Sequence, residues 1–532
     1  MNKRVLVIGL DGFEISIART MIKDGKLPYM AEMFASSAFF NLDHGDARNT
    51  GLAWEHFSTG QEPDSYKKWS AIDFDADTYS VNQSGFRGVP FTADLPVYLV
   101  AFDVPYLELA DSQIVGMSNW GAHDPGVQRN SNPPELLDEI EVRFGPYPAP
   151  QQIYGFVWPS VGKTQRMASE LTAAAKKRSD IIEWLFSERY PDWELGIAVT
   201  SELHSGIEAL WHGWDENHPL HSVASAEAAR IGIEDLYIET DRMLANLAAK
   251  FPDATLIAFS MHGMGANNAD VHSMILLPEF MYRRTFGTPF LHPKEEWVRS
   301  NGCEMDDNSD WTQAILPRMG HRSPDSLREQ FRGKMRRLGL NLKTTSLAEP
   351  VRFNPAESLS WMPSVHYKRF WPEMSAFAMP SFYEGQIRVN LQGREAEGII
   401  ALEDYAAFLD QLEQDLFRLT DFQTGESVVE KVERPLSEDP LSADSSQCDL
   451  RISWKTLSAG FQHPEFGAIG PVPHRRPGGH TGEFGFATVM NSPLATGDHG
   501  TRSSFDVVPT IFELCGYEFG KGTISGRSLL KD

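Results

Sequence analysis

Residues 4–12 read RVLVIGLDG, an apolar run that ends in an aspartate and a glycine. A short apolar run bounded by a turn signal is typical of a buried strand. The residues that follow, 14–35, predict a helix. A strand, a polar residue at its carboxyl end and then a helix form the repeating unit of an α/β sheet, and ligands collect at that strand end.

The same pattern returns further along the chain. Residues 195–200 (LGIAVT) predict a second strand, which lies between helical stretches at 163–188 and 225–250. Residues 254–260 (ATLIAFS) predict a third strand. A polar segment follows each of these strands. The sequence therefore predicts an α/β core in which three strand ends deliver polar side chains.

The stretch 275–380 has a different character. It is rich in Arg, Pro, Trp and Met and has weak periodicity, which indicates an insertion or cap. We therefore assign the catalytic core to 1–274 and 381–532. A cap over a rigid sheet commonly sets specificity. Four of its arginines are candidates for holding a substrate, although each is equally well explained as solvated surface: Arg283, Arg284, Arg318 and Arg322.

The charge composition restricts which kinds of molecule the protein can bind. The 532 residues include 73 acidic and 48 basic side chains, a formal net charge of −25. This charge repels nucleic-acid backbones and anionic membranes, so we expect neither as a partner. A small anionic ester remains a possible substrate, because a bound cation can reverse the field inside one cleft.

The cellular location is predicted from cysteine usage and hydropathy. Three widely separated cysteines argue against a disulfide scaffold and fit a reducing compartment. The apolar run at the start is shorter than a secretory segment, and no window approaches the ~20 apolar residues of a membrane span. We therefore expect a cytoplasmic protein without a membrane segment.

Six residues near these strand ends or in later loops carry nucleophilic or metal-binding groups: Asp11, Thr50, His204, Glu208, His262 and His480. Each has an ordinary explanation by itself. Asp11 could cap the next helix, and the spacing of His204 and Glu208 suits a solvated helix face. The argument for a site therefore depends on the whole set and its order.

Five motifs occur in order along the chain: GLDG at 9–12, TGLAW at 50–54 with STGQEP at 58–63, SMHGMG at 260–265, GGHTG at 478–482 and FDVVPT at 505–510. Together they resemble the alkaline phosphatase superfamily, in particular its type I phosphodiesterase/nucleotide pyrophosphatase branch. The resemblance implies an α/β sandwich with a mostly parallel central sheet, helices on both faces and an insertion.

The resemblance also implies an activity, the hydrolysis of phosphate esters through a phosphorylated Thr50. Two divalent metal ions, zinc or alternatively manganese, are expected as cofactors. One would be held by Asp11, Thr50 and His262, and the other by His204, Glu208 and His480. In such sites one ion activates the nucleophile while the other stabilises the phosphoryl and leaving oxygens.

Three departures from the family pattern matter, and in one of them Leu52 replaces the proline after the nucleophile and Tyr66 replaces a histidine. Met261 replaces an aspartate ligand and is a poor ligand for a hard cation. His204 and Glu208 stand where the family has Asp and His, which is an exchange between suitable ligand types. Several nearby residues could compensate for Met261: Asp43, His44, Asp46, Asp270 and His272.

Two alternatives to a phosphate ester hydrolase remain open. The same fold supports hydrolases of phosphonates and sulfate esters, and phosphoryl transferases. Met261 motivates the other alternative, a non-catalytic binding protein whose metal site has degenerated.

Overall fold

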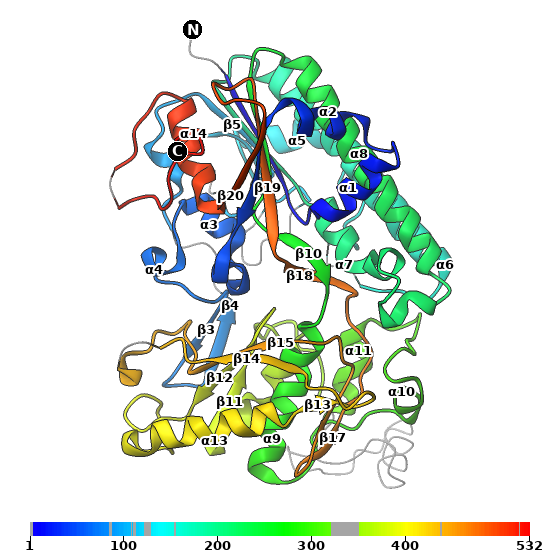
Figure 1. The fold of residues 1–532 in the computed structure, drawn as a ribbon, viewed down its shortest axis with the longest axis vertical. Coiled ribbons are helices and arrows are strands. Elements are labelled where there is room, and N and C mark those ends of the chain that lie inside the picture. The colour runs from blue at the N-terminus through cyan, green and yellow to red at the C-terminus, as the bar shows by residue number, and fades with distance from the viewer. Residues whose placement is uncertain are drawn as a thin grey trace. The chain divides into compact units, whose positions relative to one another are not determined.

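The computed structural model describes residues 4–83, 88–107, 109, 113–121, 129–153, 156–320, 351–436, 439–520 and 522–531. The chain forms two compact units (Figure 1). The first contains Met1–Trp69, Ser84–Ala266 and Arg476–Asp532, and the second contains Ser70–Gln83 and Asn267–Arg475.

The first unit is built on a nine-stranded sheet with the order β20-β2-β19-β9-β1-β8-β5-β6-β7. Five neighbouring pairs are parallel, and the three that involve β19 or β7 are antiparallel. The mostly parallel sheet is therefore confirmed. The strands are β1 (Val5–Leu10), β2 (Ala38–Asp43), β5 (Leu99–Phe102), β6 (Val115–Ser118), β7 (Asn130–Asn132), β8 (Leu195–Thr200), β9 (Thr255–Ser260), β19 (Phe484–Met490) and β20 (Gly497–Ser503).

Helices cover both faces of this sheet (Figure 1). Leu6, Ile8 and Leu10 of β1 pack into one apolar cluster, while Val5 and Val7 pack into another. This alternation follows from the two-residue period of a strand. The first cluster includes α1 (Ile15–Lys23), α2 (Pro28–Ser36), α5 (Leu136–Phe144), α6 (Val161–Trp184), α7 (Glu202–Trp214) and α8 (Ala226–Lys250), and the second includes α3 (Ala53–Thr59) and α14 (Val507–Leu514).

The helix predicted over 14–35 is two helices, α1 and α2. Pro28 opens α2 at its first position, where its missing N–H costs no hydrogen bond. A continuous helix through that residue would lose a bond in its interior. The other long helices of the first unit, α6 and α8, lie within four residues of their predicted limits.

The second unit holds an antiparallel four-stranded sheet with the order β11-β12-β15-β14. Its strands are β11 (Ala376–Met379), β12 (Gly385–Val389), β14 (Val429–Glu433) and β15 (Leu450–Trp454), accompanied by β3 (Ile72–Asp75), β4 (Ser80–Gln83), β13 (Thr420–Asp421), β16 (Phe461–His463) and β17 (Gly467–Ile469). Its helices include α9 (Leu277–Phe286), α10 (Glu295–Ser300), α11 (Trp311–Ile315) and α13 (Tyr405–Phe417).

This second unit extends beyond the predicted insertion at 275–380, because it also contains 70–83, 267–274 and 381–475. The sheet explains the difference. Strand β12 pairs with β11 on one side and with β15 on the other, so the chain after 380 completes a sheet that begins before it. A role as a cap stays a prediction.

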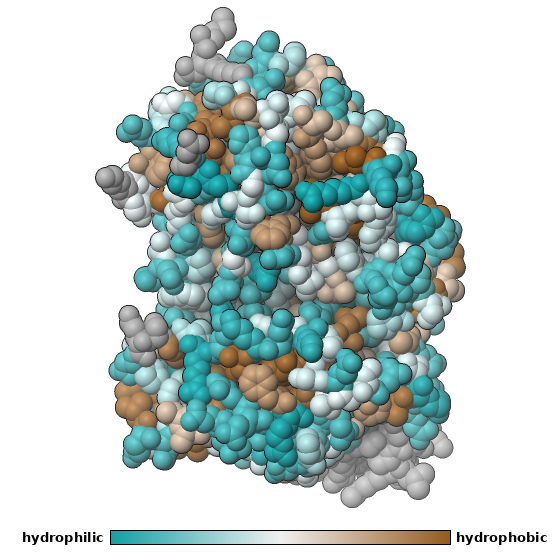
Figure 2. Space-filling view, in the orientation of Figure 1, coloured by the Kyte–Doolittle hydropathy of each residue, from teal (hydrophilic) through white to brown (hydrophobic). Residues whose placement is uncertain are grey.

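The visible surface is mainly hydrophilic, with small scattered hydrophobic groups (Figure 2). Within the ranges that the structure describes, no helix is both long and apolar enough to cross a membrane.

Candidate metal centre

Helix α7 presents His204 and Glu208 on one face, because residues four apart on a helix lie one above the other. The helix begins directly after β8, at the carboxyl end of a parallel strand. Its first residue, Glu202, is held by the buried guanidinium of Arg178, with Nε–Oε2 at 2.8 Å. Arg178 also binds Asp103 at 2.7 Å. A buried ion network therefore fixes the start of the helix that carries two site residues.

Strand β18 (Gly478–Gly482) brings His480 to this helix. It pairs antiparallel with β10 (Gly263–Ala266), which follows β9. A Cβ on Gly478 would lie 2.2 Å from the backbone oxygen of Ile207 in α7. Only glycine permits this close approach of the strand to the helix. The absence of a side chain at Gly478 therefore allows β18 to place the imidazole of His480 beside α7.

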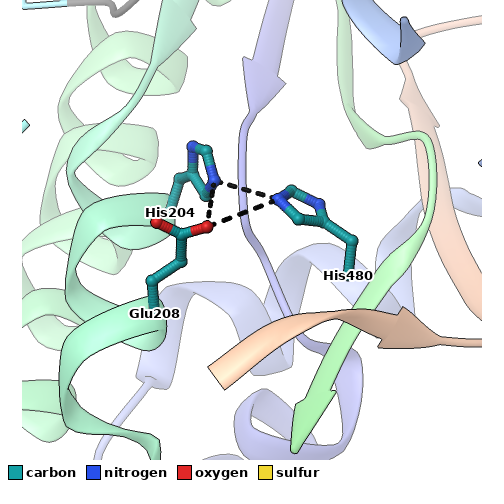
Figure 3. Close-up of side chains that lie close together, drawn as sticks. All are labelled: His204, Glu208 and His480. Carbon is teal, nitrogen blue, oxygen red and sulfur yellow. Dashed lines mark hydrogen bonds and ion pairs between the residues drawn. The ribbon is translucent and has the colours of Figure 1, made fainter. Parts of the chain in front are cut away.

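His204, Glu208 and His480 converge (Figure 3). The two imidazole Nε2 atoms are 2.9 Å apart. Glu208 Oε1 lies 3.1 Å from Nε2 of His204 and 3.8 Å from Nε2 of His480. All three side chains are buried, and among the described residues they form the one group of three or more histidine, cysteine, aspartate or glutamate side chains close enough to hold a metal ion.

Asp11 supports this group from the end of β1. Its Oδ2 lies 3.1 Å from Nδ1 of His204. Gly12 makes the approach possible, because its φ is +72° and a Cβ there would lie 2.3 Å from the Cα of His204. A carboxylate that accepts from Nδ1 fixes the imidazole orientation and directs Nε2 toward the centre of the group.

Neighbouring charges shift the pKa values of all three donors. Burial lowers the pKa of His204, but Asp11 and Glu208 outweigh it and raise this pKa to about 10. Burial raises the pKa of Glu208, but Arg476 and His204 hold it well below its usual value. Burial and the nearby His204 keep the pKa of His480 well below 6.5. The metal-free group therefore combines a carboxylate with one charged and one neutral imidazole.

Sequence reasoning missed Arg476, although it lies in the stretch that leads to His480. Its Nη1 donates to Glu208 Oε1, the same oxygen that faces both imidazoles. The two residues are 268 positions apart, so no local spacing connects them.

The donor set of this group fits a zinc ion. Two imidazole nitrogens and one carboxylate are a known catalytic zinc set, which leaves a position open for substrate or water. The observation that supports the fit is the convergence of two buried Nε2 atoms and a carboxylate oxygen on one point.

The residues of the second predicted ligand set, Asp11, Thr50 and His262, have contacts with other groups. His262 lies near the group, with its ring 4.9 Å from that of His480, and its Nδ1 donates to the Gly263 carbonyl. Thr50 Oγ1 donates to Ala47 O and accepts from Leu52 N. The side chain of Met261 belongs to an apolar cluster. Binding of a second ion by Asp11, Thr50 and His262 stays a prediction.

The residues proposed to compensate for Met261 have other contacts or exposed positions. His44 lies 6.2 Å from His262 between ring centroids and contacts Ser504 and His56 at 2.5 Å and 3.1 Å. In the second unit, Asp270 binds Arg475 at 2.7 Å and His272 stacks on Trp454. Asp43 and Asp46 are exposed.

Three of the arginines proposed to hold substrate have partners inside the second unit. Arg283 binds Glu279, and Arg284 binds Asp415 at 2.9 Å. Arg318 donates to the carbonyl of His292. Arg322 lies outside the described residues.

Among solved structures, alkaline phosphatase PafA aligns with this chain at a TM-score of 0.50 and 11% identity, over 99% of this chain and 98% of that one. The chain has an alkaline phosphatase fold. Phosphonoacetate hydrolase from Sinorhizobium meliloti 1021 aligns at a TM-score of 0.46 and 12% identity, over 97% of this chain and 95% of that one. Human ectonucleotide pyrophosphatase/phosphodiesterase 5 aligns at a TM-score of 0.46 and 10% identity, over 99% of this chain and 98% of that one. No family model and no curated protein match the sequence.

Proposed function

We propose that this protein is a metal-dependent hydrolase of small phosphate esters, with Thr50 as nucleophile. The convergence of His204, Glu208 and His480 carries the proposal. His204 and Glu208 follow the carboxyl end of β8, and Asp11 follows that of the adjacent parallel strand β1, which is where α/β sheets place their ligands.

A divalent cation held by His204, Glu208 and His480 would supply Lewis acidity toward an ester oxygen. The chain contributes the orientation of the donors. Asp11 Oδ2 forms an ion pair with Nδ1 of His204, and Gly263 O accepts from Nδ1 of His262. Both contacts involve Nδ1, so Nε2 is the ligand atom of each imidazole, and His204 would release a proton on binding the cation.

Thr50 would act in two balanced steps. Its Oγ1 forms a bond to phosphorus as the ester oxygen leaves, and the leaving alcohol takes up the proton that Thr50 loses. Water then attacks phosphorus, releases phosphate and returns a proton to Oγ1. Before attack, Thr50 must exchange the hydrogen bond that it now donates to Ala47 O.

The test is hydrolysis of p-nitrophenyl phosphate and bis(p-nitrophenyl) phosphate by zinc-loaded wild type and Thr50→Ala. We expect a loss of at least about 10³-fold in kcat in the variant, since the residue that forms the covalent intermediate is gone. Thr172→Ala is the matched control, because its hydroxyl makes the same kind of bond, 2.9 Å to the Ala168 carbonyl in α6. Retained turnover in Thr50→Ala would refute the proposal.

The Glu208–Arg476 ion pair favours a second candidate, a metal-free binding protein, because an internal cation already occupies the carboxylate. The two candidates separate on metal content. A hydrolase retains zinc or manganese and cleaves an ester, whereas the binding protein does neither. Comparing phosphate, phosphonate and sulfate esters then identifies the substrate class.

A further inference from the structure

Arg476 and the proposed metal share one ligand atom. Nη1 of Arg476 donates to Glu208 Oε1, and the same Oε1 lies nearest to the two imidazole nitrogens. A cation bound between these three donors would therefore meet Arg476 at this oxygen. Both carry positive charge, so occupancy of the oxygen by one opposes occupancy by the other.

The pair is buried on both sides, with 9% of the Arg476 side chain and 2% of the Glu208 side chain exposed. Solvent screens such a pair poorly, so its effect on a competing cation is larger than that of a surface pair. Arg476 also stands two residues before β18, which holds its backbone beside the group. A displaced guanidinium would therefore remain close to the donors.

Charge balance indicates what the displaced guanidinium would bind. A metal-bound His204 is neutral, so Asp11 and Glu208 supply two negative charges, which a single divalent cation neutralises. Arg476 then leaves one positive charge in excess. A guanidinium presents several N–H donors in a planar fork that matches two oxygens of a phosphoryl group.

We propose that Arg476 is the internal counter-ion of Glu208 in the metal-free protein, that a divalent cation displaces it, and that the displaced guanidinium then binds the phosphoryl oxygens of the substrate. This inference rests on the proposed function for its metal and its substrate class. Arg476 thereby couples metal binding to anion binding, and each ligand raises the affinity for the other.

The first test measures zinc affinity by competition with a chromophoric chelator, in metal-stripped wild type, Arg476→Gln and Arg476→Lys. We expect Arg476→Gln to bind zinc at least tenfold more tightly, because no internal cation has to leave Glu208. Arg476→Lys keeps the charge and should remain within threefold of wild type.

Arg475→Gln is the matched control. Arg475 is the preceding residue and forms an equally buried ion pair, with Asp270 of the second unit at 2.7 Å. Its loss should leave zinc affinity within twofold of wild type. Thermal unfolding of each variant shows whether it folds.

The second test measures binding of inorganic phosphate by calorimetry to the zinc-loaded proteins. Arg476→Gln should bind phosphate at least tenfold more weakly than wild type and Arg475→Gln. Saturating phosphate should tighten zinc binding in wild type and have little effect in Arg476→Gln.

Zinc binding that is unchanged or weaker in Arg476→Gln overturns the inference, since Arg476 would then only orient Glu208. The proposed hydrolase would survive that result. If Arg476→Gln binds zinc and wild type does not, the competition between Arg476 and the metal ion is supported, but the proposed function of the wild-type protein is refuted. Absence of zinc from both proteins refutes both ideas, and unchanged phosphate affinity overturns the role in anion binding.

Discussion

Asp11 orients His204 through a contact of 3.1 Å between Oδ2 and Nδ1. Residues that orient a metal ligand without touching the metal commonly contribute about 10–100-fold to metal affinity. Asp11→Ala should therefore weaken zinc binding by about 10–100-fold, measured by chelator competition. Asp241→Ala is the control, because Asp241 is a carboxylate of the same unit that accepts from the backbone of Tyr29 and Met30. Equal zinc affinity in Asp11→Ala and wild type would contradict this role.

At the residue scale, the proximity of several site candidates follows from sequence, while their role as metal ligands stays a prediction. His204 and Glu208 share a helix face by spacing alone, and His480 joins them in the structure. The contact of Arg476 with Glu208 could not be predicted, because it depends on how β18 crosses α7. Thr50 was named from its motif, and its role stays a prediction.

The approach of β18 to α7 is an element-level feature that depends on Gly478. A Cβ at this position would lie 2.2 Å from Ile207 O, so strand and helix would have to separate. Gly478→Ala should lower the free energy of unfolding by about 1–3 kcal/mol and weaken zinc binding, as overpacking does elsewhere. Urea unfolding and zinc titration measure the two effects.

Gly162→Ala in α6 is the matched control, because a Cβ there would have no neighbour within 4 Å. It should leave zinc affinity unchanged and stability equal or slightly higher. Equal behaviour of the two glycine variants would show that the strand–helix approach does not position His480.

The start of α7 depends on the buried Arg178, which binds both Glu202 and Asp103. Removal of one member of a buried ion network typically costs about 3–5 kcal/mol, because the others keep unpaired charges. Arg178→Leu should lose that amount in urea unfolding. Arg143→Leu removes the exposed pair with Glu188 and should cost at most about 1 kcal/mol. Similar losses in the two variants would contradict the account.

Elements with strong apolar runs were predictable, and elements that depend on distant pairing were not. The strands at 195–200 and 254–260 appear as β8 and β9, beside β1. The extent of the second unit was not evident, because its short antiparallel strands pair across intervening chain, as Gly385 of β12 does with Ile452 of β15. Sequence periodicity carries little information about such pairing.

Across the whole molecule, several buried histidines outside the donor group are kept neutral. Burial lowers the pKa of His212 to about 4 and that of His56 to about 3. The unfolded chain binds their protons near pH 6.5, so each histidine favours unfolding as pH falls below that value. Folding stability should therefore decrease between pH 7 and pH 5.

His212→Gln tests this pH dependence. A histidine with a pKa near 4 in the folded state costs about 2 kcal/mol between pH 7 and pH 5. The variant should lose about 2 kcal/mol less than wild type over this range in urea unfolding. Identical losses would show that folding does not lower the pKa of His212.

The proposed function depends on the binding of a divalent metal ion by His204, Glu208 and His480. The most direct measurement is the number of zinc or manganese ions per chain in wild type and His480→Ala, by plasma mass spectrometry. We expect at least one tightly held ion in wild type and the loss of one ion in the variant. Absence of metal from wild type after exposure to zinc or manganese, or the same metal content in both proteins, would contradict it.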